Sequence, residues 1–130
     1  MIRLGFFLIA GMWSAFGQVA LASPPSGQAV DLVEILSEAQ PGTGEDWLVV
    51  RVLAPAIGEE GFDPNAAQED LDWVCATWGL EAAQNSTDTP ALIVVQMMDR
   101  IVPRGQAAPE ATQFFAGYSI ENDLCIWEVF

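Results

Sequence analysis

Two arginines on one short stretch have the spacing that best suits a binding site. They are Arg100 and Arg104, and a pair of guanidinium groups on a proline-containing loop can hold a carboxylate or phosphate through bidentate hydrogen bonds. The neighbouring side chains that could share in ligand binding are Asp99, Glu110 and Gln113. The alternative is internal pairing, which would fasten the loop to the rest of the domain. The acids available for it are Asp99, Glu110 and Glu128.

Composition excludes the common catalytic constellations. The chain contains no histidine, which excludes Ser-His-Asp and Cys-His nucleophile systems and histidine metal sites. It contains no lysine, which excludes a P-loop lysine and a Schiff base. We therefore assign no catalytic residue, no cofactor and no metal site. The 18 acidic residues are compatible with a carboxylate pair of the glycosidase type, so a small carboxylate-dependent hydrolase is the alternative to a non-enzymatic function.

The first 22 residues have the features of a secretory signal peptide. Arg3 supplies a short positive region, residues 4–16 are apolar apart from one serine, and residues 20–22 form an Ala-x-Ala cleavage site. We expect cleavage after Ala22, which leaves residues 23–130 as a single periplasmic or secreted domain. An uncleaved N-terminal anchor is the alternative. Once the signal is removed, no remaining stretch is long and apolar enough for a membrane span.

The expected mature chain is strongly acidic. Losing Arg3 leaves three arginines against 18 acids, a formal charge of 3 − 18 = −15. Such a charge repels nucleic acid and anionic lipid headgroups, so we expect neither as a partner. It would favour a cationic partner, although solubility or a salty environment explains the same composition.

The two cysteines, Cys75 and Cys125, are 50 positions apart. Two cysteines in an exported chain are expected to form a disulfide, and the alternative is two buried free thiols. There is no C-x-x-C pair, so a thioredoxin-like redox function has no support.

Residues 63–79 carry the clearest helix pattern. Asp63 suits the N-cap, Pro64 suits the first helical position, and Gly79 suits a C-terminal stop. Helical spacing places one group of residues on a single apolar face: Ala67, Leu71, Val74, Cys75 and Trp78. The residues expected mostly on the opposite side are Gln68, Glu69, Asp70 and Asp72.

The other segments read as strands. The expected strands are residues 29–36, for which a helix is the competing interpretation, and residues 47–54, 90–98, 111–120 and 124–130. The third is almost continuously apolar, so both of its faces should be buried. The predicted fold class is α+β, with a mostly antiparallel sheet of about five strands in the order β-β-α-β-β-β and one helix packed on a face.

A two-residue turn at Asn122 and Asp123 predicts the register of the last hairpin, with Ile120 opposite Cys125 and Tyr118 opposite Trp127. The face that should meet the helix carries Ala116, Tyr118, Ile120, Cys125, Trp127 and Val129. The other face carries Phe115, Leu124, Ile126 and Phe130, with Ser119 and Glu128 among them. It is too apolar for an ordinary solvated face, so we expect the first hairpin, the long loops or another subunit to cover it.

Several short motifs resemble an uncharacterised family of small exported bacterial proteins. They are Met98-Asp99-Arg100, residues 109–115, Cys125-Ile126-Trp127-Glu128 with Phe130, Ser26-Gly27-Gln28 and Leu53-Ala54-Pro55. The resemblance covers about a third of the chain and implies a bacterial signal peptide and a domain of unknown function. Some similar chains carry an automated acetolactate synthase label, but a thiamine-diphosphate enzyme needs a far longer chain and a cofactor motif that is missing here.

These observations favour a non-enzymatic periplasmic binding or protein-interaction module. Its expected surface is the loop that carries Arg100 and Arg104, together with exposed apolar residues of the sheet. A protein of the cell envelope is one expected partner, and a homodimer through the apolar sheet face is the other.

Overall fold

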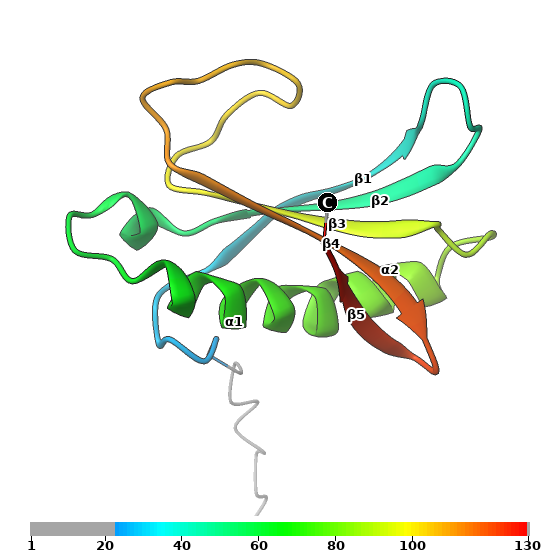
Figure 1. The fold of residues 1–130 in the computed structure, drawn as a ribbon, viewed down its shortest axis with the longest axis horizontal. Helices are drawn as coiled ribbons and strands as arrows, with labels where there is room; N and C mark the ends of the chain where they lie inside the picture. The colour runs from blue at the N-terminus through cyan, green and yellow to red at the C-terminus, as the bar shows by residue number, and fades with distance from the viewer. Residues whose placement is uncertain (1–22, 130) are drawn as a thin grey trace, which may run out of the picture.

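The computed structural model describes residues 23–129 (Figure 1). The predicted signal peptide, residues 1–22, lies outside the described residues, as does Phe130 of the predicted last strand. Among the helices of the described residues, none has the length and apolar character needed to cross a membrane.

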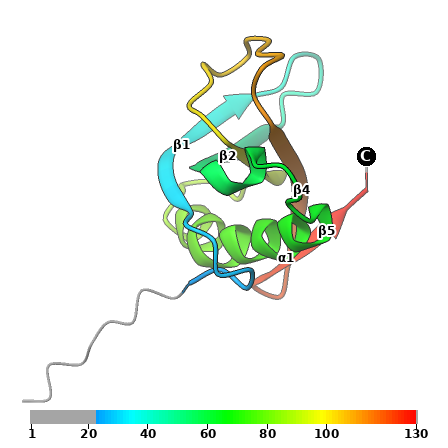
Figure 2. The ribbon, with the colours of Figure 1, turned by 90° about the vertical axis from the view of Figure 1, so that its left-hand side faces the viewer.

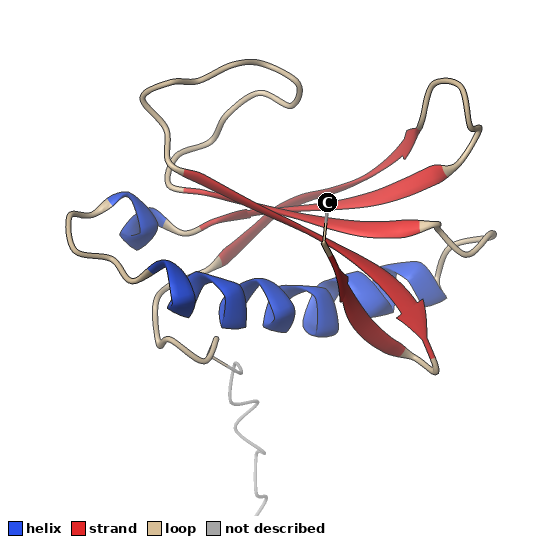
Figure 3. Cartoon of the chain, in the orientation of Figure 1, coloured by secondary structure: helices blue, strands red, loops and turns tan. Residues whose placement is uncertain are grey.

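Five strands form one mixed sheet in which sequence neighbours are also spatial neighbours, in the order β1-β2-β3-β4-β5. The strands are β1 (Asp31–Ala39), β2 (Asp46–Leu53), β3 (Leu92–Met98), β4 (Gln113–Glu121) and β5 (Leu124–Glu128). Strands β2 and β3 are parallel, because a helix connects them, and the other three pairs are antiparallel. The predicted α+β class with a mostly antiparallel sheet is confirmed (Figure 3).

The helix begins as predicted and ends later than predicted. Asp63 caps α1 (Pro64–Val74) by accepting a hydrogen bond from the backbone N–H of Asn65. A π-helical turn, η2 (Cys75–Gly79), follows and leads into α2 (Leu80–Gln84). A short 3-10 helix, η1 (Pro55–Gly58), precedes α1.

The prediction that Gly79 stops the helix is therefore wrong. Gly79 has right-handed helical angles, φ −67° and ψ −48°. A Cβ atom on it would lie 2.9 Å from Cγ2 of Ile93, a buried residue of β3. Because Gly79 has no side chain, the helix can approach the sheet closely at this point. This packing explains why a glycine occurs inside the helix rather than at its end.

The helical segments cover one face of the sheet, and the core lies between them (Figures 1 and 2). Alternate residues of β2, β3 and β4 supply the sheet side of the core: Leu48, Val50, Val52, Ile93, Val95, Met97, Ala116 and Tyr118. Strand β3 is buried on both faces from Ile93 to Met98, as its apolar run predicted. Something other than the helix therefore covers part of the opposite face.

Asp70 is buried, and its predicted place on the solvent side of the helix is wrong. Its carboxylate accepts hydrogen bonds from the backbone N–H of Ser26 at 2.9 Å, from the Ser26 hydroxyl, and from Nε2 of Gln28 at 2.6 Å. The described start of the chain thus lies against α1. The periodicity of the helix did not reveal that Ser26 and Gln28 cover Asp70, because these residues are polar and lie outside the helix.

Candidate interaction surface

The β4–β5 hairpin has the predicted register. Ile120 lies opposite Cys125 and Tyr118 opposite Trp127. The turn residues Asn122 and Asp123 both have positive φ, 51° and 60°, as a two-residue type I′ turn requires. Because residues directly opposite each other share a face, this register decides which side chains of β5 turn toward the helix.

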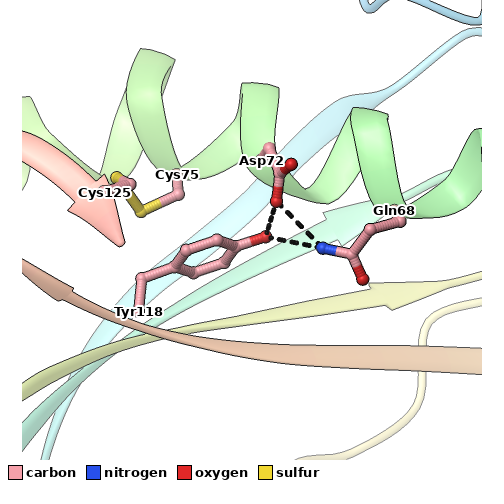
Figure 4. Close-up of a disulfide and its surroundings, with 5 residues drawn as sticks. All are labelled: Gln68, Asp72, Cys75, Tyr118 and Cys125. Atoms are coloured by element: carbon pink, nitrogen blue, oxygen red, sulfur yellow. Dashed lines mark hydrogen bonds between the residues drawn. A yellow bond between two sulfur atoms is a disulfide. The ribbon is translucent and has the colours of Figure 1, made fainter. Parts of the chain in front are cut away.

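A disulfide joins Cys75 of η2 to Cys125 of β5, as predicted (Figure 4). Beside it, the buried hydroxyl of Tyr118 donates a hydrogen bond to Oδ1 of Asp72 at 2.6 Å, and Nε2 of Gln68 donates to the same oxygen at 2.9 Å. Burial, followed by the hydrogen bond to Asp72, raises the pKa of Tyr118 above its ordinary value. These contacts fasten the hairpin to the helix.

The prediction that Trp127 meets the helix is wrong, because Trp127 is 52% exposed. In β5, Cys125 is half-buried, and the other four residues of the strand are exposed. The strand contacts the helical segments around η2, where the disulfide is, and Trp127 lies beyond that contact. The predicted register of the hairpin, which puts Trp127 on the same face as Cys125, is correct. The helix is too narrow to cover the whole of that face of β5.

The opposite side of the hairpin carries an uncovered apolar group. Phe115, Leu124 and Ile126 are 55%, 61% and 37% exposed, and they lie on the face that turns away from the helix. Ser119, directly opposite Ile126, donates a hydrogen bond to Glu128 on the same face. We call Phe115, Leu124 and Ile126 the open β4–β5 face.

The neighbouring part of the same face, over β2 and β3, is covered by the loop of residues 99–112, which rises on the side away from the helix (Figure 1). Val102 of this loop is buried, and its carbonyl accepts a hydrogen bond from the guanidinium of Arg51. Arg51 is itself only 4% exposed and is also paired with Glu34. The expectation that a long loop covers the second face therefore holds for β2 and β3 and fails for the open β4–β5 face.

A cluster of polar side chains lies beneath this loop. Oε1 of Gln96 accepts hydrogen bonds from Nε of Arg51 and from an amino group of Arg104, each at 3.1 Å. Arg104 also makes a bidentate ion pair with Glu38, at 2.7 and 2.9 Å. Nε2 of Gln96 donates to Oε1 of Gln113 at 2.8 Å. The cluster links four strands to the loop, and its buried charges are paired.

Four of the five predicted ligand residues fall into two groups, and the fifth, Glu110, belongs to neither. Arg104 and Gln113 are brought together through Gln96. Arg100 and Asp99 pair with each other at 3.2 Å where the loop begins, and Asp99 also accepts a hydrogen bond from the backbone N–H of Thr112. Glu110 is exposed on the loop.

Both acids that pair with these arginines are held in the charged form. The hydrogen bond from Arg104 lowers the pKa of Glu38, and the hydrogen bond from Arg100 lowers the pKa of Asp99. In return, Glu38 raises the pKa of Arg104. A ligand carboxylate that binds Arg104 through both nitrogens would have to displace Glu38.

Arg51 and Gln96 were missed as members of this site. They lie directly opposite each other in the parallel β2–β3 register. A usable signal was present, because each is the polar residue inside an otherwise apolar buried strand. A polar residue in such a strand needs a partner, and a polar residue in the neighbouring buried strand can supply one.

A model of DUF6497, a family of unknown function, matches residues 9–130 of the chain, and the chain belongs to this family. No curated protein and no solved structure matches it.

Proposed function

We propose that this member of DUF6497 is an exported, non-enzymatic protein-interaction module that contacts its partner through the open β4–β5 face. The proposal is carried by the exposure of Phe115, Leu124 and Ile126 on the same side of two adjacent strands. Leu124 and Ile126 are neighbours on this face of β5, and Phe115 lies on the same face four residues before Ser119, the residue opposite Ile126. Single exposed apolar side chains are common, whereas exposed apolar groups gathered on one face are typical of interaction sites. Covering this face would remove apolar surface from water at a gain of about 25 cal/mol per Å².

The proposed compartment is the periplasm or the exterior of a bacterium, after cleavage behind Ala22. The Cys75–Cys125 disulfide supports it, because disulfides form and persist in oxidising compartments. The signal-peptide features of residues 1–22 support it independently. The partner is then a protein of the cell envelope.

The two acids whose pKa values are shifted, Glu38 and Asp99, are unsuited to act as the general acid of a carboxylate-dependent hydrolase. Such an enzyme needs one acid that stays protonated near its working pH, which requires a raised pKa. The carboxyl groups of Glu38 and Asp99 shift the other way, because arginine hydrogen bonds stabilise their charged forms.

The proposal is tested by the size of the native complex in envelope extract. The tagged mature protein should migrate in a complex larger than its own mass. Phe115→Ser combined with Ile126→Ser should return it to the monomer position, because both substitutions remove apolar contact area. Leu32→Ser is the matched control, since Leu32 is an exposed apolar residue of β1, at the other edge of the sheet. Wild-type protein that migrates as a free monomer would refute the proposal, as would a complex that survives the double substitution.

A further inference from the structure

The two edges of the sheet differ in how well they are protected against pairing with another chain. Edge strand β1 has a register irregularity between Leu32 and Glu34 and carries several acidic residues. Bulges and charges are the usual means by which proteins block an edge strand. The other edge strand, β5, has a continuous register with β4 and the sequence Leu-Cys-Ile-Trp-Glu. It therefore lacks the register irregularity that interrupts β1.

The outer edge of β5 presents unpaired backbone groups. Glu121 and Leu124 flank the two-residue turn as a hydrogen-bonded pair, and bonding to β4 then alternates along the strand. The backbone N–H and C=O groups of Cys125 and Trp127 consequently point away from the sheet. A further strand could pair with them without disturbing the β4–β5 ladder.

Apolar side chains flank this edge on both sides. Leu124 and Ile126 lie on the open β4–β5 face, and Trp127 lies on the other face of the same strand. All three are exposed. A strand added beside β5 would cover them with its own alternating side chains, as in recognition by strand addition.

Charge decides which occupant fits the edge. Each described arginine is paired with an acid of the chain: Arg51 with Glu34, Arg100 with Asp99, and Arg104 with Glu38. Near the edge of β5 the exposed charges are the acidic residues Glu121, Asp123 and Glu128. A second copy would bring the same uncompensated negative charge to the contact, and like charges across a contact are unfavourable. A partner segment rich in lysine or arginine would neutralise it.

We infer, on the basis of the proposed function, that the partner contributes an extended segment of alternating apolar and basic residues, which pairs with β5 as a sixth strand. The backbone of the segment bonds Cys125 and Trp127. Because alternate residues of a strand face opposite sides, its apolar residues cover Leu124 and Ile126 on the open β4–β5 face. Its basic residues then lie on the other face, beside Trp127, where the net negative charge of the chain attracts them.

The first test uses the mature protein and peptides of about eight residues, a usual strand length. A peptide that alternates valine and lysine should bind in calorimetry. The same peptide with glutamate in place of lysine, and a lysine peptide N-methylated at every residue, should each bind at least about tenfold more weakly. Equal binding of the glutamate peptide would overturn the basic chemistry. Equal binding of the N-methylated peptide would overturn strand pairing.

Two variants of one position separate the backbone contribution from the side-chain contribution. Trp127→Ala removes the indole and keeps the outward N–H, whereas Trp127→Pro removes both, at an edge position where the β4 ladder does not use that N–H. Trp127→Pro should bind the lysine peptide about tenfold more weakly than Trp127→Ala. Equal affinities would contradict the inference.

Amide exchange in the wild-type protein gives an answer that does not depend on the folding of a variant. Saturating lysine peptide should slow exchange at Cys125 and Trp127, and leave Ile126 little changed because its N–H already bonds β4. An unchanged rate at Cys125 and Trp127 would overturn the inference, and so would a wild-type protein that is dimeric in sedimentation at micromolar concentration.

The inference and the proposed function can fail separately. If the envelope complex is lost in the Phe115→Ser, Ile126→Ser variant and the peptides do not bind, the interaction module stands and strand addition is refuted. If the complex itself is absent, the proposed function is refuted.

Discussion

Removing the Cys75–Cys125 disulfide, by Cys75→Ala together with Cys125→Ala, should both lower global stability and loosen β5. Apart from Cys125, the side chains of β5 are exposed, so the strand is held mainly by its hydrogen bonds to β4 and by the disulfide. The double substitution removes the covalent link and leaves the hydrogen-bonded ladder as the main attachment.

The size of the loss follows from the length of the closed loop. The cysteines are 50 positions apart, and the chain-entropy relation gives about 4 kcal/mol for a loop of that length at 25 °C. Since such gains are often only partly realised, we expect the free energy of unfolding to fall by about 3–4 kcal/mol. A domain of this size typically has about 5–15 kcal/mol, so the variant should still fold.

Two measurements check this prediction. Urea unfolding should show a lower midpoint for the double variant, and wild-type protein reduced with dithiothreitol should match it. Hydrogen exchange should accelerate at Ile126, whose amide bonds β4, much more than at Val95 in the centre of the sheet. A loss below about 1 kcal/mol, or exchange at Ile126 that changes no more than at Val95, would refute this account of how β5 is attached.

Four further substitutions follow from contacts already described. Arg104→Ala should lower the free energy of unfolding by about 1 kcal/mol in urea titration, whereas Arg100→Ala, at an exposed pair, should leave it almost unchanged; equal effects would contradict the role given to the cluster beneath the loop. The cost of Arg104→Ala should be full above pH 4.5, the ordinary pKa of Glu38, and should shrink as the pH falls through the lowered pKa, because protonated Glu38 no longer forms the ion pair; a cost independent of pH from 7 to 3 would count against it. Tyr118→Phe should lower the free energy of unfolding by about 1 kcal/mol in thermal unfolding, because it removes the hydrogen bond to the Asp72 carboxylate. An unchanged melting temperature would show that this bond does not contribute to stability. Gly79→Ala should destabilise the fold despite a better helix propensity, since the new methyl group overpacks the core by about 1–3 kcal/mol; a stabilised variant would refute the close-approach argument.

Local rules predicted the parts of this fold that depend on neighbouring residues. Asp63 and Pro64 marked the start of the helix, because capping is decided within one turn. Asn122 and Asp123 fixed the hairpin register, because they tolerate the positive φ of a tight turn. The disulfide followed from compartment and cysteine count, and once formed it confirmed which face of the hairpin meets the helix.

The parts that sequence reasoning missed depend on contacts between distant segments. Gly79 is helical because Ile93 leaves no room for a side chain, and nothing near Gly79 in the sequence shows this. Asp70 is buried because the polar start of the chain bonds it. Trp127 is exposed because the helix covers only part of β5. For Trp127 the predicted register was correct, and what the sequence did not show was how much of β5 the helix covers.

The prediction of the candidate site was incomplete for the same reason, because its contacts join segments that are far apart in the sequence. The loop that carries Arg104 was identified from sequence, but its partner Glu38 lies 66 positions earlier, on β1. An ion pair between segments so far apart cannot be predicted from spacing. Arg51 and Gln96 were the stronger signal, because polar residues inside buried strands must find partners.

The most direct test of the account is site-specific photo-cross-linking in living cells. A photoreactive residue in place of Ile126, on the open β4–β5 face, should give a discrete adduct with one envelope protein, and the same residue in place of Leu32, on β1, should not. The absence of any adduct from position 126, or the same adducts from both positions, would contradict the claim that this face is where the protein meets its partner.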